Sequence, residues 1–387
     1  RVLDEFGLIV CGWSGAWDTA LRDAIARCPN RRYTTFWATI GKPHRLAQDL
    51  ITKRAARVIR IESADAFFNG LAERITALEE VDRPHPLTAQ MAAAMLKRYL
   101  AEDRHRIRLH DLVMGEVSAA SSRTRTDEFS LHANSSDEEF RRRVAAYEAA
   151  TEILRKLAVT GAYWSRQETD RLWIEVVRRL TLARHGVAGV GTWIELQSYP
   201  ATLTLYAAGL GALAAGNFRL VNDLLTCLVA NGHEREIAAA RLLPFALEIQ
   251  RERWWCLPDL ERRHTPLNDH LLDLLRPELA ELIPTDQELE EAFDRFELLA
   301  GLVHLHHAAG ERDPDPEQCW LPVGRFAWRL TRSYYGESLM SWLANAEQQR
   351  EEWPPLRAGM FGGSYARFAV LNHAFVSFMG RIRSRFW

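Results

Sequence analysis

The residues best suited to chemistry lie in a short glycine-rich turn near the start of the chain. Residues 12–15 read Gly-Trp-Ser-Gly, follow the apolar run Leu8–Cys11, and lead into an amphipathic stretch over residues 17–27. Where a strand passes into a helix through two glycines, backbone N–H groups and the helix dipole can hold a phosphate. Ser14 could bond a phosphate oxygen or cap the helix. A plain helix cap is the competing interpretation, because short glycine motifs often match by chance.

Three strand and helix units follow one another across the first 81 residues. The sequence predicts strands over residues 8–11, 33–37 and 57–61, and helices over residues 17–27, 45–54 and 64–78. Such alternation indicates parallel strands joined by crossover helices, an α/β fold. Open sheets of this kind bind ligands at the carboxyl ends of their strands, where the turn lies. Because parallel sheets need both faces covered and the chain opens on Arg1 rather than Met, we expect further units before Arg1.

These units resemble the C-terminal part of the sirtuin domain, particularly the sirtuin-like domains of bacterial antiphage defence proteins that hydrolyse NAD. The resemblance rests on residues 8–14, 31–40 and 57–78, about a fifth of the chain. The turn at residues 12–14 resembles the sirtuin Gly-Thr-Ser turn, which touches the NAD phosphates and ribose. Trp13 departs from the usual small residue, and Phe36-Trp37-Ala38 departs from the usual Ile-Asn.

The resemblance implies NAD as ligand and substrate, held in a Rossmann-like, sirtuin-type sheet of which this chain carries the last strands and helices. The residues expected to bind it are Gly12, Trp13, Ser14, Gly15, Ser63, Ala64 and Asp65. The first glycine-rich loop, the residue that orients water and the catalytic His would precede Arg1. We therefore expect no catalytic residue in this chain and no NAD hydrolysis by the chain alone.

Composition narrows the function classes. The length of 387 residues suggests two or three domains, and a hydrophobic content of 47% is enough for sizeable cores. A net charge of −2 disfavours nucleic acid as a partner. The five cysteines never form Cys-x-x-Cys, so the zinc site of many sirtuins has no counterpart, no metal is expected, and a reducing cytoplasm is favoured. The longest uncharged stretch, residues 196–217, contains Gln197, Pro200 and several glycines, and its apolar part is shorter than the roughly 20 residues of a membrane span.

A charged segment over residues 79–86, with prolines at 84 and 86, separates the α/β part from an all-α part. Helical periodicity predicts helices over residues 88–101, 105–117, 140–158, 168–185, 201–215, 218–230 and 234–252, with no strand after Ile61. A mobile loop is expected over residues 118–136, ended by a capping box at Ser136. The domains expected are 1–81, 82–139 as a linker with a helix pair, and 140–387.

The segment over residues 206–228 resembles one helix-turn-helix unit of a tetratricopeptide-type solenoid. Its small residues would allow close approach of two helices, with Gly216-Asn217 making the turn. Since no clean repeat period is visible, the pattern fits either an irregular stack of helical hairpins, solenoid-like and suited to sensing, or an ordinary helical bundle.

Three hypotheses remain from the sequence. The favoured one is a sirtuin-like NAD hydrolase that depletes NAD in antiphage defence when a phage or host protein triggers the helical region, as a cytoplasmic homo-oligomer. The second is an NAD-dependent protein deacylase. The third is a non-catalytic nucleotide-binding and protein-interaction scaffold.

Overall fold

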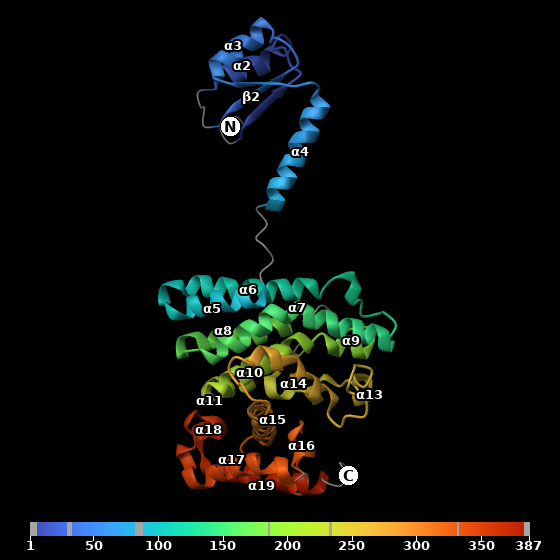
Figure 1. Ribbon diagram of the computed structural model, residues 1–387, viewed down its shortest axis with the longest axis vertical. Helices are drawn as coiled ribbons and strands as arrows, with labels where there is room; N and C mark the ends of the chain where they lie inside the picture. Colours follow the sequence, from blue (N-terminus) through green and yellow to red (C-terminus); the bar gives the residue numbers. More distant parts are fainter. Residues whose placement is uncertain are drawn as a thin grey trace. The chain divides into compact units, whose positions relative to one another are not determined.

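The computed structural model describes residues 6–28, 33–81, 88–184, 186–231, 234–330 and 333–382. Contacts within the chain divide it into two compact units, Arg1–Pro86 and Leu87–Trp387. The first contains the α/β elements, and the second is almost entirely helical (Figure 1).

The first unit is built on a three-stranded parallel sheet in the order β1-β2-β3. Its elements are β1 (Leu8–Cys11), α2 (Thr19–Arg27), β2 (Thr35–Thr39), α3 (Arg45–Arg54), β3 (Arg57–Arg60) and α4 (Ala64–Val81). The predicted alternation and α/β class are therefore confirmed. The first helix begins two residues later than predicted, and the second strand is shifted by two residues toward the C-terminus.

The core of this unit lies on one face of the sheet. Val10 and Trp37 are register partners on β1 and β2, and both are buried against side chains of α2 and α3 such as Ile25 and Leu50. Ile9 points to the opposite face because side chains alternate along a strand. It is 40% exposed. The apolar positions of the sheet are thus only partly covered within the described residues.

The second unit stacks its helices in successive layers, from α5 and α6 at one end to α17 and α19 at the other (Figure 1). The longer helices are α5 (Ala89–Ala101), α6 (Arg106–Arg123), α7 (Asp137–Tyr163), α8 (Gln167–Leu182), α9 (Gly191–Leu196), α10 (Tyr199–Ala214), α11 (Phe218–Thr226), α14 (Pro266–Leu279), α15 (Asp286–Ala309), α17 (Ser333–Gln349) and α19 (Tyr365–Ile382). Short α-helical turns are α12 (Ala238–Arg241), α13 (Arg251–Trp254), α16 (Phe326–Arg329) and α18 (Pro354–Arg357). Five 3₁₀ turns occur among the described residues, at Asp103–His105, Asp127–Phe129, Pro244–Leu247, Arg350–Glu352 and Met360–Gly363.

A β-hairpin occupies the end of the helix predicted over residues 218–230 and the start of the helix predicted over residues 234–252. After α11 the chain forms β4 (Leu228–Asn231), which pairs antiparallel with β5 (Glu234–Ile237). Asn231 is followed in the sequence by Gly232, the strongest short-range hairpin signal, although residues 232 and 233 lie outside the described part. Exposed Leu228 next to buried Val229 shows the alternation of a strand. The helix predicted over residues 218–230 is confirmed as α11 up to Thr226, whereas the predictions of a helix over residues 234–252 and of no later strand were wrong.

The loop predicted over residues 118–136 is wrong in its first part, because α6 continues to Arg123. The hydroxyls of Ser118 and Ser121 donate to the carbonyl oxygens of Met114 and Val117, four residues earlier, at 3.0 and 2.7 Å. Serine in this arrangement is compatible with a helix interior. Both α5 and α6 pack on α7, so the helix pair assigned to a linker belongs to the second unit. The capping role of Ser136 is confirmed, with Oγ accepting from the Glu139 amide at 3.1 Å.

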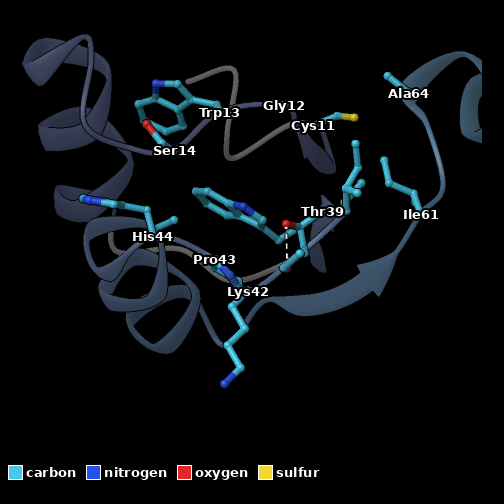
Figure 2. A pocket seen from close by; sticks show the side chains of 15 residues that line it. Cys11, Gly12, Trp13, Ser14, Thr39, Lys42, Pro43, His44, Ile61 and Ala64 are labelled. Carbon is cyan, nitrogen blue, oxygen red and sulfur yellow. Dashed lines mark hydrogen bonds between the residues drawn. The ribbon is translucent and has the colours of Figure 1, made fainter.

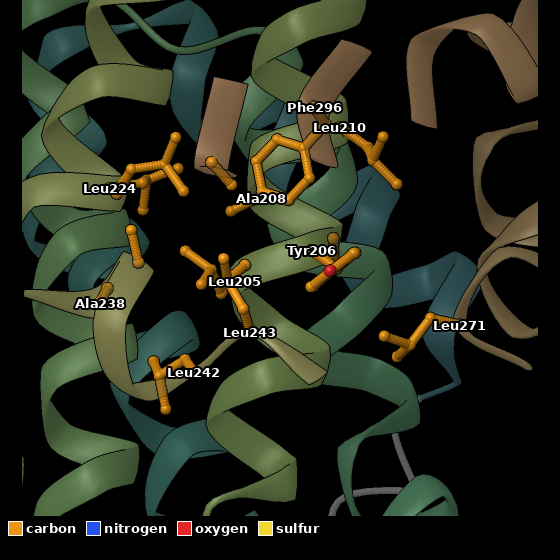
Figure 3. Close-up of a cluster of buried hydrophobic side chains, with 14 of the residues drawn as sticks. Leu205, Tyr206, Ala208, Leu210, Leu224, Ala238, Leu242, Leu243, Leu271 and Phe296 are labelled. Carbon is orange, nitrogen blue, oxygen red and sulfur yellow. The ribbon is translucent and has the colours of Figure 1, made fainter. Parts of the chain in front are cut away.

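Helix α10 is the centre of the second unit. Of its 16 residues, 14 are buried, and Figure 3 shows Leu205, Tyr206 and Leu210 among side chains from other elements. A helix that is apolar on all sides is typical of a core position rather than of the outer layer of a repeat.

Glycines on α10 allow close approach of neighbouring helices, as the sequence predicted. A Cβ atom at Gly211 would lie 2.4 Å from the carbonyl oxygen of Val159, and one at Gly209 would lie 2.2 Å from Phe296. The close partners are therefore α7 and α15, whereas the sequence suggested the following helix. Gly216 has φ +69° in the turn before α11, and the Asn217 side chain caps that helix.

A buried ionic cluster joins α14, α15 and the segment before α16. The Arg325 Nε lies 3.0 Å from Asp269 Oδ1. The Arg325 backbone amide donates to Glu297 Oε2 at 2.7 Å, and Asn268 Nδ2 donates to Glu297 Oε1 at 2.5 Å. Burial raises the pKa of Glu297 to about 8.

Candidate nucleotide site

A cavity of about 330 Å³ opens at the carboxyl ends of the three parallel strands. This is the position at which open α/β sheets bind ligands. Its walls come from the turn after β1, the loop from β2 into α3, and the start of α4. The lining residues are Cys11, Gly12, Trp13, Ser14, residues 37–44, Ala47, Ile61 and Ala64 (Figure 2).

The glycine turn leaves room for a ligand beside its backbone. Gly12 has φ +68°, a left-handed conformation that glycine adopts without steric cost, and a Cβ added there would meet nothing within 4 Å. The space beside the Gly12 backbone is therefore open to a ligand atom.

The interpretation of Ser14 as a helix cap is wrong. Helix α2 starts at Thr19, and the side chain of Asp18 caps it by accepting from the Leu21 amide at 2.9 Å. Ser14 Oγ instead accepts from the Ala16 amide at 3.3 Å, within the turn itself. The turn does not run directly into the helix, so the α2 dipole acts on this cavity from farther away than the sequence suggested.

Trp13 forms an aromatic wall of the cavity. Its ring stacks on Trp37, with centroids 6.0 Å apart and an interplanar angle of 21°. The indole Nε1 donates to the carbonyl oxygen of Trp17 at 3.0 Å, which fixes the ring orientation. The residue that departs from the sirtuin pattern is therefore held in place by its own contacts.

The loop between β2 and α3 contributes to the cavity, and sequence reasoning missed it. Thr39 Oγ1 donates to the Gly41 carbonyl oxygen at 3.0 Å, and His44 caps α3 by accepting from the Leu46 amide at 3.4 Å. Figure 2 shows the Lys42 side chain pointing away from the turn at Gly12. The signal that could have found this loop is its position directly after the carboxyl end of β2.

The predicted binding residues divide into two groups. The cavity brings together Gly12, Trp13, Ser14 and Ala64. Gly15, Ser63 and Asp65 lie outside its lining. Gly15 packs against the start of α3, where a Cβ would lie 3.2 Å from the Ala47 amide nitrogen, and Ser63 Oγ accepts from the Ala66 amide at 3.1 Å.

The one lysine among the described lining residues, Lys42, extends away from the turn at Gly12 (Figure 2). Among the described residues the lining includes Lys42 and His44 but no Asp or Glu. Over the same part of the chain, no group of three or more His, Cys, Asp or Glu is placed to hold a metal ion. Nor is any described helix long and apolar enough to cross a membrane.

No protein-family model, no curated protein and no solved structure matches this chain.

Proposed function

We propose that the first unit binds NAD in the cavity at the carboxyl ends of β1 to β3, with the phosphates beside the backbone of Gly12 and Ser14. The observation that carries this proposal is the meeting of the glycine turn with a cavity of about 330 Å³ at that edge of the sheet. The Trp13–Trp37 stack and the absence of carboxylates among the described lining residues fit an anionic ligand that carries flat rings.

On this proposal the unit is part of a larger Rossmann-like, sirtuin-type domain that hydrolyses NAD in bacterial antiphage defence. The role of this chain is to bind and orient the dinucleotide. Trp13 offers a flat surface on which one ring of the dinucleotide can stack. The hydrolytic step belongs to residues outside the chain, as the sirtuin resemblance implies. The helical unit would receive the trigger and support homo-oligomerisation in the cytoplasm.

Non-catalytic nucleotide binding is the second candidate. It is supported by the lining of the cavity, where His44 is engaged as a helix cap and no described Asp or Glu is present to act as a base. NAD turnover by the intact protein would separate the two functions, because a pure binding module leaves nicotinamide bonded to the ribose.

Isothermal titration with NAD tests the binding site directly. Gly12→Val places a side chain in the space beside the turn, so we expect affinity for NAD to fall at least about tenfold, a loss of about 1.4 kcal/mol of binding free energy. Ser14→Ala removes one hydroxyl and should weaken binding about tenfold or less.

A matched control separates backbone strain from ligand contact. Gly359 also has a positive φ, +90°, and open space around it, but it lies in the helical unit. Gly359→Val should therefore bring similar backbone strain without loss of NAD affinity. If Gly12→Val folds and binds NAD as tightly as the parent does, the turn does not hold the dinucleotide.

A further inference from the structure

A second cavity, of about 400 Å³, lies in the helical unit between α5, α7 and α14. Charged side chains dominate its lining. Four are carboxylates and two are cations, namely Glu148, Glu152, Glu278 and Glu281 with Arg155 and Lys156. The cavity therefore carries an excess of negative charge and is of a size suited to a small molecule.

The two cations are already engaged by the protein. Arg155 donates through Nε to Glu278 Oε1 at 3.0 Å and through Nη1 to the Glu148 carbonyl oxygen at 2.5 Å. Lys156 Nζ donates to the Glu278 carbonyl oxygen at 3.1 Å and lies 3.8 Å from Glu281. These contacts tie α14 to α7 and hold the cavity wall in shape.

Glu278 is left with unused hydrogen-bonding capacity in this lining. The residue is only 9% exposed, and its Oε2 is buried without a hydrogen-bond partner among the described residues. A buried acceptor without a donor costs free energy. Burial, with a smaller contribution from the negative charge of Glu152, raises the pKa of Glu278 to about 7, although Arg155 and Lys156 act to lower it.

Glu148 and Glu152 differ in the number of partners that their carboxylates have. Glu148 Oε1 accepts from the Tyr199 hydroxyl at 2.8 Å and lies 2.6 Å from His270 Nε2, so its position is fixed. Glu152 is exposed and forms no ion pair with any described residue. Glu278 is paired with Arg155 through Oε1 only, so among the described residues the lining keeps an unpaired charge at Glu152 and an unpartnered acceptor at Glu278 Oε2.

We propose that this cavity binds a small organic cation whose ammonium or guanidinium N–H groups hydrogen-bond to Glu278 and whose charge is balanced by Glu152. Such a ligand would supply the donor that Glu278 Oε2 lacks and would offset the repulsion between the two carboxylates. A quaternary ammonium ion has no N–H to donate. The described residues also offer no cluster of three ligands for a metal ion. This site is independent of the nucleotide site proposed above.

Isothermal titration of the full chain with spermidine and with arginine amide tests the proposal, with choline as a cation of similar charge but without N–H donors. We expect saturable binding of spermidine or arginine amide, and none of choline. Glu278→Gln should weaken the affinity at least about tenfold, because a charge-assisted hydrogen bond is lost. Glu152→Gln, at an exposed position where folding is little affected, should weaken it by a smaller factor.

The control variant is Glu317→Gln, which removes an exposed carboxylate of the same unit outside this cavity. It should bind spermidine as the parent does, whereas non-specific attraction to an acidic surface would weaken equally in all three variants. The proposal is overturned if neither probe binds saturably at millimolar concentration. Equal affinity of the parent, Glu278→Gln and Glu152→Gln chains would overturn it as well.

The pH dependence gives a second readout. The groups that face Glu278 are Glu148, Glu152, Glu281, Arg155, Lys156 and the His270 bonded to Glu148. Because the cation binds the ionised carboxylate, affinity should rise between about pH 6 and about pH 8 as Glu278 loses its proton. This rise should disappear in Glu278→Gln. A parent affinity that falls over the same range would contradict the assignment.

Discussion

A close contact between α7 and α10 predicts opposite effects for the same substitution at two glycines. Gly211 on α10 faces α7, and an added Cβ would lie 2.4 Å from the Val159 carbonyl oxygen and 3.1 Å from Val159 Cα. These atoms are backbone and cannot rotate away, so the two helices would have to separate. Gly115 is an exposed interior residue of α6, and a Cβ there would meet nothing within 4 Å.

The expected change in the free energy of unfolding is the sum of two opposing effects, overpacking and helix propensity. Overpacking a core costs about 1–3 kcal/mol, and the rigid contact places Gly211→Ala near the upper end. Replacing glycine by alanine inside a helix returns about 1 kcal/mol. We therefore expect Gly211→Ala to lower the free energy of unfolding by about 2 kcal/mol and Gly115→Ala to raise it by about 1 kcal/mol, from propensity alone.

Urea denaturation followed by far-ultraviolet circular dichroism measures both variants, because the helical unit dominates this signal. The comparison is internal: each variant adds the same methyl group to a helical glycine. A Gly211→Ala chain as stable as the parent, or more stable, would show that α7 and α10 are not in the close contact that the distances describe.

Three further outcomes follow from the geometry. The pKa of Glu297 in the folded chain, about 8, lies above its ordinary value, so folding favours the protonated carboxyl group. The resulting contribution to the free energy of unfolding is fully present below about pH 4 and is lost as the pH rises through 8, with about 3 kcal/mol lost by pH 7. Urea titrations at several pH values should show this decline in the parent and not in Glu297→Gln. Arg325→Met leaves Asp269 without its buried partner and should cost about 3–5 kcal/mol in the same assay. Asp18→Ala removes the cap of α2 and should lower the stability of the first unit by about 1 kcal/mol, seen as faster amide exchange at Leu21, whereas unchanged exchange would contradict the cap.

Local patterns in the sequence were sufficient to predict the elements that are stabilised by residues close to them in the sequence. Helix α3 was predicted over its whole length, and Ser136 was identified as the cap of α7, because the cap, the apolar face and the terminus are all encoded within a few residues. The turn at Gly216-Asn217 was predicted for the same reason.

Elements that depend on distant contacts were not predictable in the same way. The β4–β5 hairpin had a local signal in Asn231-Gly232, which the helical prediction overlooked, while Val229 and Ile237 are buried through contacts with distant helices. The serines of α6 suggested a loop because composition does not show that Ser118 and Ser121 bond back to their own helix. At the cavity, the turn was identified from its glycines, whereas residues 39–44 became visible only when the strands were placed side by side.

The enclosure of α10 by later parts of the chain has a consequence for biosynthesis. On the ribosome this segment emerges well before α15, whose Phe296 covers Gly209. Until α15 has been made, a nascent chain carries a long apolar helix whose final partner does not yet exist. The helical unit therefore cannot complete its core while it is being translated, and the nascent chain is expected to be a substrate for chaperones that shield apolar segments until α15 has been synthesised.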